Sequence, residues 1–430
     1  MRNIIVVDNY DTRNNGVMAM GISFVQKVSE YFDNPKVSFY SFFKEVDSAR
    51  YRDYGVRVNS MFWKSKLRPG KFFDIIWFLA LSLLAMVGKF IPFVKFRNSI
   101  DPFRETDAIV SLCGEDLYSD HCSWQLVLYE LFPFVMAKIF NKPYVIFAQT
   151  LGPFTKKRSK FLLKHVIGNA SLVLIREKVS FDMVIDMVPE KKSRIVLTGD
   201  SAFFLKPIEL FVAQELVKKD LNKDIYNKNV IGISVSQLFT QSIFPVINSR
   251  EHKYESFVDS IAKISDFLCE QLNVNILFVP HVTVPHNDDR KIAFDILNKV
   301  KTRDSVFALK HEYKADQIKG MIHACDSFVG CRMHSLVAAV SGNIPTLALA
   351  YSYKTVGVIG PIVGDKLLVD VRSASPQELV AKVIDGMLYL YDNKSEVIRT
   401  ITINMEKQFK VSLKNFELLK GLVNKECVNR

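Results

Sequence analysis

The sequence predicts an α/β protein built from two Rossmann-like domains that face each other across a cleft. Short runs of β-branched and other apolar residues alternate with longer helical stretches in both halves of the chain. This pattern is typical of parallel strands that are buried on both faces and joined by helices. A length of 430 residues fits two domains better than one. The clearest strand-like runs are residues 4–7, 108–112, 144–148, 172–175, 230–235, 275–279, 327–329 and 345–350.

The alternation stops in a polar stretch rich in Lys and Asn, and we place the domain boundary there. The predicted N-terminal Rossmann-like domain covers residues 1–205, and residues 206–229 form a linker. The C-terminal Rossmann-like domain covers residues 230–395, and residues 396–430 form a C-terminal helix. Ligands of such sheets bind at the carboxyl ends of the strands, so the loops that follow the strands are the places to seek function.

The charge balance points to an anionic partner. The 57 Lys and Arg against 45 Asp and Glu give a formal net charge of +12, which fits nucleic acid, a phosphorylated small molecule or an acidic membrane surface. No basic run with interleaved aromatics and no finger or RNA-recognition motif is present, so no nucleic acid is expected. Six scattered cysteines and an N-terminal apolar run too short for a signal peptide predict a cytoplasmic protein.

Residues 72–95 form an apolar segment that breaks the pattern. Its uncharged part, residues 75–88, is shorter than the ~20 residues that a membrane-spanning helix needs. Two interpretations remain open. The segment is either a buried helix of the N-terminal domain or an apolar hairpin whose basic rim rests on anionic lipids at the cytoplasmic face of the inner membrane. The basic residues of that rim are Lys64, Lys66, Arg68, Lys71, Lys89, Lys95 and Arg97.

The strongest candidate for chemistry is the sequence Gly-Cys-Arg-Met-His-Ser at residues 330–335, which follows a strand-like run. A helix that starts near Arg332 or Met333 would offer free backbone N–H groups and the positive end of its dipole to an anion. Arg332, His334 and Ser335 could complete that anion site. Alternatively, His334 caps the helix and Arg332 pairs with a surface acid. Lys354, after the next strand, is a compact cation suited to a phosphate, although a loop lysine is usually only solvated.

The N-terminal half carries further polar residues at predicted strand ends. Gly16 could let the backbone approach a ligand closely, with Asn15 as a polar contact, although a plain turn also explains both. Glu115 and Asp116 could hold a sugar hydroxyl or take its proton, although surface acids are common. Gln149 opens the sequence Gln-Thr-Leu-Gly-Pro at the end of another strand. We expect Asn15, Gly16, Glu115, Asp116 and Gln149 to bind substrate.

Two further features have competing explanations. Arg176 directly follows a predicted strand, so its guanidinium would point into the cleft unless it pairs with Glu177 or Asp182. His281 and His286 suggest a metal at first sight, but their spacing, the neighbouring prolines and the missing third ligand favour a polar loop. We therefore predict no metal.

Taken in order, these segments resemble the polysaccharide pyruvyl transferase family from about residue 4 to residue 395. Departures from the family pattern are Val17 in place of an acid, Cys113 and Glu115 in a glycine-rich loop, and Thr150 in place of Gly. The matching segments are Asn14-Asn15-Gly16, Gly114-Glu115-Asp116, Gln149-Thr150-Leu151-Gly152-Pro153, Arg176-Glu177 with Ser180, Gly199-Asp200, Gly330-Cys331-Arg332-Met333-His334-Ser335, and Tyr351-Ser352-Tyr353-Lys354 with Gly357.

The resemblance implies a fold like that of the two-domain GT-B glycosyltransferases and an activity without a cofactor. The family transfers a pyruvyl group from phosphoenolpyruvate to two hydroxyls of a sugar, which forms a cyclic ketal and releases phosphate. The C-terminal domain would then be the donor side and the N-terminal domain the acceptor side. The acceptor would be a sugar or lipid-linked saccharide of bacterial cell-surface or exopolysaccharide synthesis.

By the family pattern, His334, Arg176 and Lys354 match the positions that hold phosphoenolpyruvate. We expect His334 to donate a proton or bind phosphate, while Arg176 and Lys354 neutralise carboxylate and phosphate. Two other functions remain open on the same fold. One is a glycosyltransferase that uses a nucleotide sugar, and the other is a membrane-associated scaffold without activity.

Overall fold

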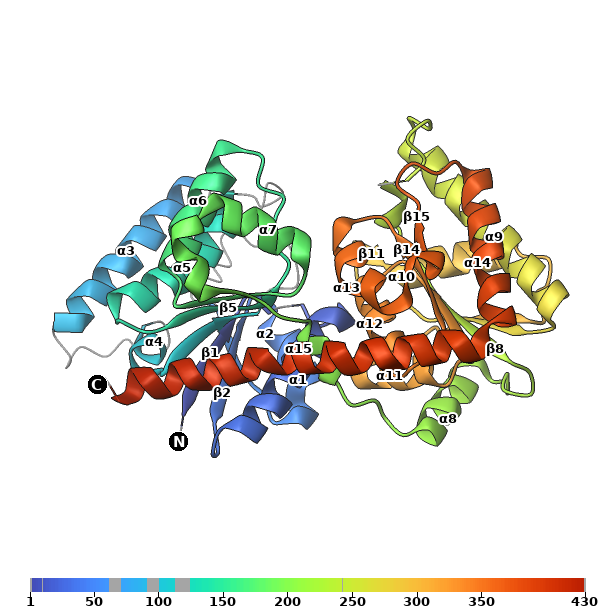
Figure 1. Cartoon of the computed structure of the whole chain (residues 1–430). Coiled ribbons are helices and arrows are strands. Elements are labelled where there is room, and N and C mark those ends of the chain that lie inside the picture. The colour runs from blue at the N-terminus through green and yellow to red at the C-terminus, as the bar shows by residue number, and fades with distance from the viewer. Residues whose placement is uncertain are drawn as a thin grey trace. The chain divides into compact units, whose positions relative to one another are not determined.

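The computed structural model describes residues 2–9, 11–61, 71–90, 100–112, 124–241 and 243–428 (Figure 1). The chain divides into two compact units. The first unit comprises Met1–Thr12, Met20–Ser201 and Val411–Arg430, and the second comprises Arg13–Ala19 and Ala202–Lys410. Each unit contains a parallel sheet with helices between its strands. The predicted α/β class with two Rossmann-like units is confirmed.

The first unit contains a seven-stranded parallel sheet in the order β3-β2-β1-β4-β5-β6-β7. The chain order reverses between β1 and β4, the switch point where ligands of open α/β sheets bind. Val7 at the end of β1 lies beside Ser111 at the end of β4. The strands are β1 (Asn3–Val7), β2 (Lys36–Ser41), β3 (Arg57–Ser60), β4 (Ala108–Ser111), β5 (Tyr144–Gln149), β6 (Leu172–Ile175) and β7 (Ile195–Leu197).

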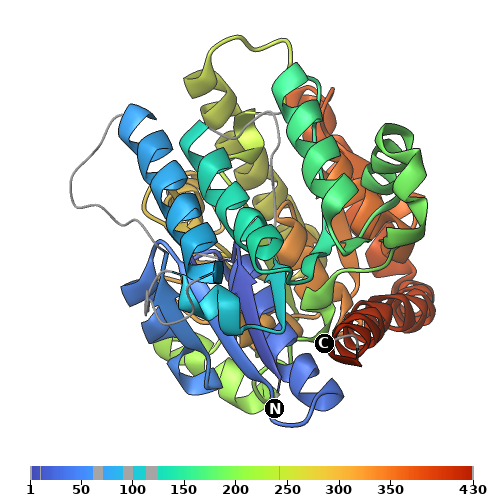
Figure 2. The same ribbon diagram turned by 90° about the vertical axis from the view of Figure 1, so that its left-hand side faces the viewer.

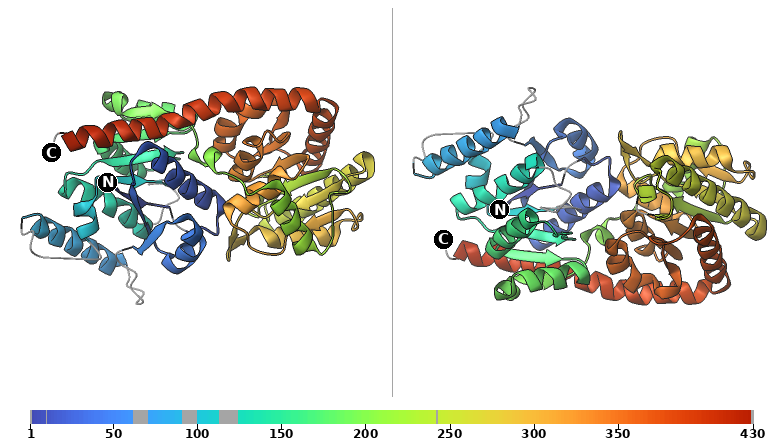
Figure 3. Two further views of the ribbon diagram at one scale, coloured as in Figure 1. Left: turned by 90° about the horizontal axis from the view of Figure 1, so that it is seen from below. Right: turned by 90° about the horizontal axis from the view of Figure 1, so that it is seen from above.

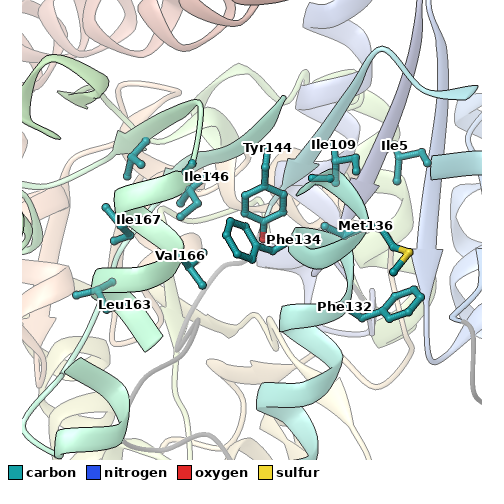
Figure 4. Packing of buried hydrophobic residues seen from close by; sticks show 14 of the residues in the cluster. Ile5, Ile109, Phe132, Phe134, Met136, Tyr144, Ile146, Leu163, Val166 and Ile167 are labelled. Atoms are coloured by element: carbon teal, nitrogen blue, oxygen red, sulfur yellow. The ribbon is translucent and has the colours of Figure 1, made fainter. Parts of the chain in front are cut away.

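Helices α3, α5, α6 and α7 pack on one face of this sheet. Their apolar side chains join those of β1, β4 and β5 in one buried cluster, in which Phe134 of α5 packs edge-on against Tyr144 (Figure 4). Figure 2 shows α3, α5 and α6 side by side. The helices of this unit are α1 (Asn15–Tyr31, whose first five residues belong to the second unit), α2 (Lys44–Tyr51), α3 (Lys71–Phe90), α4 (Asp101–Glu105), α5 (Trp124–Ile139), α6 (Lys157–Asn169) and α7 (Lys178–Met187).

The second unit contains a six-stranded parallel sheet in the order β12-β9-β8-β13-β14-β15. Its strands are β8 (Val230–Ser234), β9 (Asn275–Phe278), β12 (Val306–Ala308), β13 (Ser327–Gly330), β14 (Thr346–Ala350) and β15 (Leu368–Asp370), and β10 (Thr283–Val284) pairs with β11 (Asn287–Asp288). Its helices are α8 (Leu210–Leu221), α9 (Arg250–Leu272), α10 (Asp289–Lys299), α11 (Ala315–His323), α12 (Met333–Val340), α13 (Tyr353–Val363), α14 (Pro376–Asp392) and the first part of α15 (Lys394–Val428).

The structure differs from the expected linker at residues 206–229. This stretch contains α8 and belongs to the second unit, where Ala213 and Val217 are buried one helical turn apart. The Asp220 carboxylate accepts hydrogen bonds from the backbone N–H groups of Lys310 and His311, which ties α8 to the unit. The polar stretch that suggested a linker, residues 218–229, is the end of α8 and the loop that follows it. The expected C-terminal helix corresponds to α15, one continuous helix (Figure 3).

The apolar segment at residues 72–95 includes α3. One side of this helix is buried, with Ser82 and Ala85 against the core and Phe78 partly buried beside it. Its opposite side exposes large apolar side chains, so α3 is a helix of the first unit that is buried on one side only. Among the described residues, no helix is both long and apolar enough to cross a membrane.

Candidate active site

His334 lies in the first turn of α12, directly after β13, as the sequence predicts. Arg332 is the N-cap residue and the helix begins at Met333. The Ser335 hydroxyl donates to the Arg332 carbonyl at 2.7 Å and lies 2.7 Å from the hydroxyl of Ser234 at the end of β8. Ser335 therefore holds the turn at the start of α12, and a contact between Ser335 and substrate stays a prediction.

Arg332 forms a buried ion pair with Asp289. Its Nη2 lies 2.6 Å from Oδ1 of Asp289, and the same nitrogen donates to Oδ1 of Asn287 at 3.0 Å. The alternative of a surface acid is therefore wrong, because Asp289 is fully buried. The Asp289 carboxylate also accepts the backbone N–H groups of His281 and Val282 at 3.2 and 2.9 Å. Arg332 and Asp289 thus fix the loop that carries His281.

His281 is a candidate that sequence reasoning set aside. Its side chain is buried, and neither ring nitrogen has a hydrogen-bond partner in the described part of the chain. Burial, followed by the proximity of His334 and Arg332, holds the pKa of His281 well below its usual range. His281 is therefore a neutral imidazole beside His334. Its position three residues after β9 was the available signal.

A small cavity lies between these groups in the second unit. It has space for about one water molecule. Its polar lining comprises Asn15, His281, Lys319 and His334. The Lys319 ammonium donates to the carbonyls of Phe203 and Leu205, and burial lowers its pKa to about 7. Among the described residues that line the cavity, three are basic and none is acidic.

Gly16 approaches His334 closely. A Cβ atom at Gly16 would lie 2.3 Å from Nδ1 and 2.6 Å from Cγ of His334. The backbone N–H of Asn15 donates to the His281 carbonyl at 3.1 Å, which fixes the start of α1 beside the imidazoles. The sequence predicts that Gly16 allows a close backbone approach, and the structure shows that the approaching group is the His334 ring.

Lys354 belongs to the same sheet edge as His334. It is the second residue of α13, which begins after β14, and it is half-buried. Because β13 and β14 are parallel neighbours, His334 and Lys354 both follow the carboxyl end of this sheet. His334 and Lys354 therefore lie at the same edge of the sheet, as the sequence predicts.

In the first unit, Arg176 forms a buried ion pair with Asp200. Its Nη1 lies 2.8 Å from the Asp200 carboxylate, and its Nε donates to the Thr150 hydroxyl at 2.8 Å. Both expected partners are engaged elsewhere. Glu177 caps α7 by accepting the Ser180 N–H, and Asp182 pairs with Lys178. The guanidinium is fully buried, so binding of phosphoenolpyruvate by Arg176 stays a prediction.

Gln149 and Asp8 meet at the switch point of the first sheet. The Gln149 amide donates to the carbonyl and hydroxyl of Ser111, whose hydroxyl donates to Asp8 at 2.6 Å. Burial raises the pKa of Asp8 to about 7, and Asp8 adopts a φ of +63°, which non-glycine residues rarely adopt. The sequence signal for Asp8 was an acid directly after the first strand. Glu115 and Asp116 lie outside the described residues.

Comparison with known proteins decides the family. A profile described as "Polysaccharide pyruvyl transferase" matches residues 18–353, most of the chain. The chain belongs to the polysaccharide pyruvyl transferase family. This pyruvyl transferase is similar to the amylovoran biosynthesis protein AmsJ of Erwinia amylovora, with 22% identity over 313 residues that cover 72% of this chain and 71% of AmsJ. The family match makes the chain a transferase enzyme.

Solved structures show that the pyruvyl transferase has a GT-B-like fold. HepE of Anabaena, solved with UDP-glucose, is 13% identical and has a TM-score of 0.56, with 98% of this chain and 100% of HepE covered. The UDP-GlcNAc 2-epimerase of Neisseria meningitidis is 10% identical with a TM-score of 0.59, over 98% of this chain and 100% of the epimerase. At these identities the likeness concerns the fold alone.

Proposed function

We propose that this enzyme moves a pyruvyl group from phosphoenolpyruvate onto two hydroxyls of a sugar, forming a ketal during bacterial cell-surface or exopolysaccharide synthesis. The observation that carries the proposal is the His334 ring at the start of α12, held against Gly16 and beside neutral His281. It supports an anion site in which one imidazole is fixed at a helix N-terminus.

The donor is highly anionic and therefore requires several cationic or N–H donors. The start of α12, His334 and Lys354 supply such groups at the carboxyl edge of one sheet. Arg332 has its charge balanced by Asp289, so its contribution is to fix the His281 loop. Arg176 remains a proposed ligand of phosphoenolpyruvate.

The reaction adds a proton to C3 of phosphoenolpyruvate, which turns the methylene into a methyl group and leaves carbocation character at C2. One sugar hydroxyl attacks C2 and loses its proton. The C2–O bond to phosphate then breaks, and the second hydroxyl attacks C2 and loses its proton. In our proposal His334 donates the first proton or binds the departing phosphate. Glu115 or Asp116 activates a hydroxyl, and Asn15 and Gln149 contact the substrates.

The proposal is tested with His334→Ala. The wild-type enzyme, given phosphoenolpyruvate and candidate saccharides, is expected to release inorganic phosphate and form a ketal methyl group visible by NMR. His334→Ala is expected to do neither, while His252→Ala, which removes an exposed histidine of α9, behaves as wild type. Near-normal ketal formation by His334→Ala would refute the role of His334.

The rival nucleotide-sugar glycosyltransferase is distinguished by its products. It would release a nucleotide from a UDP-sugar and leave phosphoenolpyruvate intact. We also propose that the enzyme works in the cytoplasm on a sugar or lipid-linked saccharide, with peripheral contact to anionic lipids of the inner membrane. Cell fractionation tests this location. If all of the protein is recovered outside the membrane fraction, the proposed membrane contact is contradicted.

A further inference from the structure

One side of α3 presents a stripe of large apolar side chains to solvent. Leu79 and Leu83 are 60% and 63% exposed, and Ile75 and Met86 are 46% and 49% exposed. At 3.6 residues per turn, these positions fall on one side of the helix. The other side packs on the core of the first unit. An apolar stripe this long on a protein surface marks an interaction site.

Helix α6 carries basic residues and no acid. Lys157, Lys160 and Lys164 are exposed and form no salt bridge with any described residue, and Phe161 among them is 69% exposed. Two of these lysines lie in the first turn, at the positive end of the helix dipole, where a cation destabilises the helix. These two lysines therefore destabilise α6, and an anionic partner bound to them would offset that effect.

The two helices belong to one layer. Ala85 of α3 and Leu163 and Val166 of α6 face the same buried cluster, and Figure 2 shows α3, α5 and α6 side by side. Side chains that point away from this cluster therefore lie on the outer side of the same layer. The apolar stripe of α3 and the lysines of α6 are parts of one surface of the first unit.

We propose that this surface, defined by Ile75, Leu79, Leu83 and Met86 of α3 and by the three lysines of α6, binds an anionic lipid bilayer. The apolar stripe enters the boundary between headgroups and acyl chains, and the lysines meet the lipid phosphates. Such a combination of an apolar face and adjacent basic residues is how monotopic helices bind membranes. Phe161 adds an aromatic side chain at the level of the headgroups.

Charge and apolarity together favour a bilayer over other partners. A second copy of the chain would bring the same uncompensated lysines to the contact, where like charges repel. A nucleic acid would use the lysines but not the apolar stripe of α3. The inference rests on the proposed function, because it assigns the membrane contact proposed there to one surface: an enzyme held at an anionic leaflet can reach a lipid-linked saccharide.

The test is binding of the full-length protein to phosphatidylcholine vesicles with and without phosphatidylglycerol, measured by flotation. A lysine near an anionic surface contributes about fivefold to binding. The variant Lys157→Gln/Lys160→Gln/Lys164→Gln is therefore expected to bind anionic vesicles about 100-fold more weakly. The matched control, Lys407→Gln/Lys410→Gln/Lys414→Gln, removes the same charge from exposed positions of α15 and should bind as wild type.

The apolar stripe is tested with Leu79→Gln/Leu83→Gln, for which we expect at least a tenfold loss of binding. Its control is Leu210→Gln, an exposed leucine of α8 in the second unit, which should bind as wild type. Thermal unfolding checks that each variant folds. Phosphate release from phosphoenolpyruvate with a soluble acceptor should stay unchanged in every variant, so loss of membrane binding and loss of the proposed activity are separate results.

Several outcomes would overturn the proposal. Wild-type protein that ignores anionic vesicles, or that binds neutral vesicles equally well, contradicts a lipid-phosphate site. An equal loss in the α15 control shows that only net charge matters. A dimer in light scattering that Leu79→Gln/Leu83→Gln dissociates assigns the stripe to a second copy instead.

Discussion

The substitution Gly16→Ala isolates the contact between the start of α1 and the His334 ring. The new Cβ atom would lie 2.3 Å from Nδ1 of His334, about 1 Å short of an ordinary contact at 3.4 Å. The ring must therefore move by about 1 Å or the first turn of α1 must shift. A displacement of this size in a reacting group costs about 100-fold in rate.

The effect on stability should be small. Alanine is better than glycine in a helix by about 1 kcal/mol, and overpacking costs about 1–3 kcal/mol. These terms oppose each other, so the free energy of unfolding is expected to change by no more than about 2 kcal/mol. A folded protein with a displaced His334 is the predicted result.

The assay is the rate of phosphate release from phosphoenolpyruvate, combined with urea unfolding. Gly421→Ala in α15 is the matched control, because no neighbour lies within 4 Å of its added Cβ. This control should gain stability and keep full activity. A Gly16→Ala enzyme with wild-type kcat would refute the argument that this contact positions His334.

Three more predictions concern the titratable side chains of Asp289, Asp8 and Lys354. Asp289→Asn leaves the buried Arg332 charge without a carboxylate, so the free energy of unfolding should fall by about 3–5 kcal/mol in urea, and a fall under about 1 kcal/mol would count against a buried ion pair. The raised pKa of Asp8, about 7, means that the folded state holds a proton that the unfolded state loses above about pH 4. Stability should therefore fall as pH rises from about 4 to 7, and Asp8→Asn should be more stable than wild type at pH 8 by up to about 4 kcal/mol but not at pH 4; parallel pH profiles would contradict this. Lys354→Gln should raise KM for phosphoenolpyruvate about tenfold or more through a lost charge-assisted contact, and an unchanged KM would remove Lys354 from the donor site.

The sheets were largely readable from the sequence because their central strands are buried on both faces. Runs such as residues 4–7 and 144–148 are continuous and apolar, and they match β1 and β5. The strands β2 and β3 were missed because polar residues alternate with apolar ones there, as expected toward the edge of a sheet. The sequence predicts a linker in place of α8 because the polar residues 218–229 at its end interrupt the alternation of strands and helices.

The sequence predicts only those parts of the candidate site whose residues are close together in the chain. The start of α12 follows from a strand end and an apolar helix, so His334 and Arg332 were placed correctly. The partners came from distant segments. Asp289, the partner of Arg332, lies 43 residues away in the sequence. Arg176 pairs with Asp200, which follows the neighbouring strand, whereas the sequence suggested the nearby acids Glu177 and Asp182 as its partners. His281 is a candidate because it lines a cavity, and no local sequence pattern predicts that cavity.

Binding of phosphoenolpyruvate at the start of α12 would be seen in a crystal structure of the enzyme soaked with phosphoenolpyruvate. We predict phosphate or carboxylate oxygens about 2.7–3.2 Å from the His334 ring and the first N–H groups of α12, with Lys354 as a further ligand. A crystal in which phosphoenolpyruvate stays away from α12 while a nucleotide sugar occupies that position would contradict it.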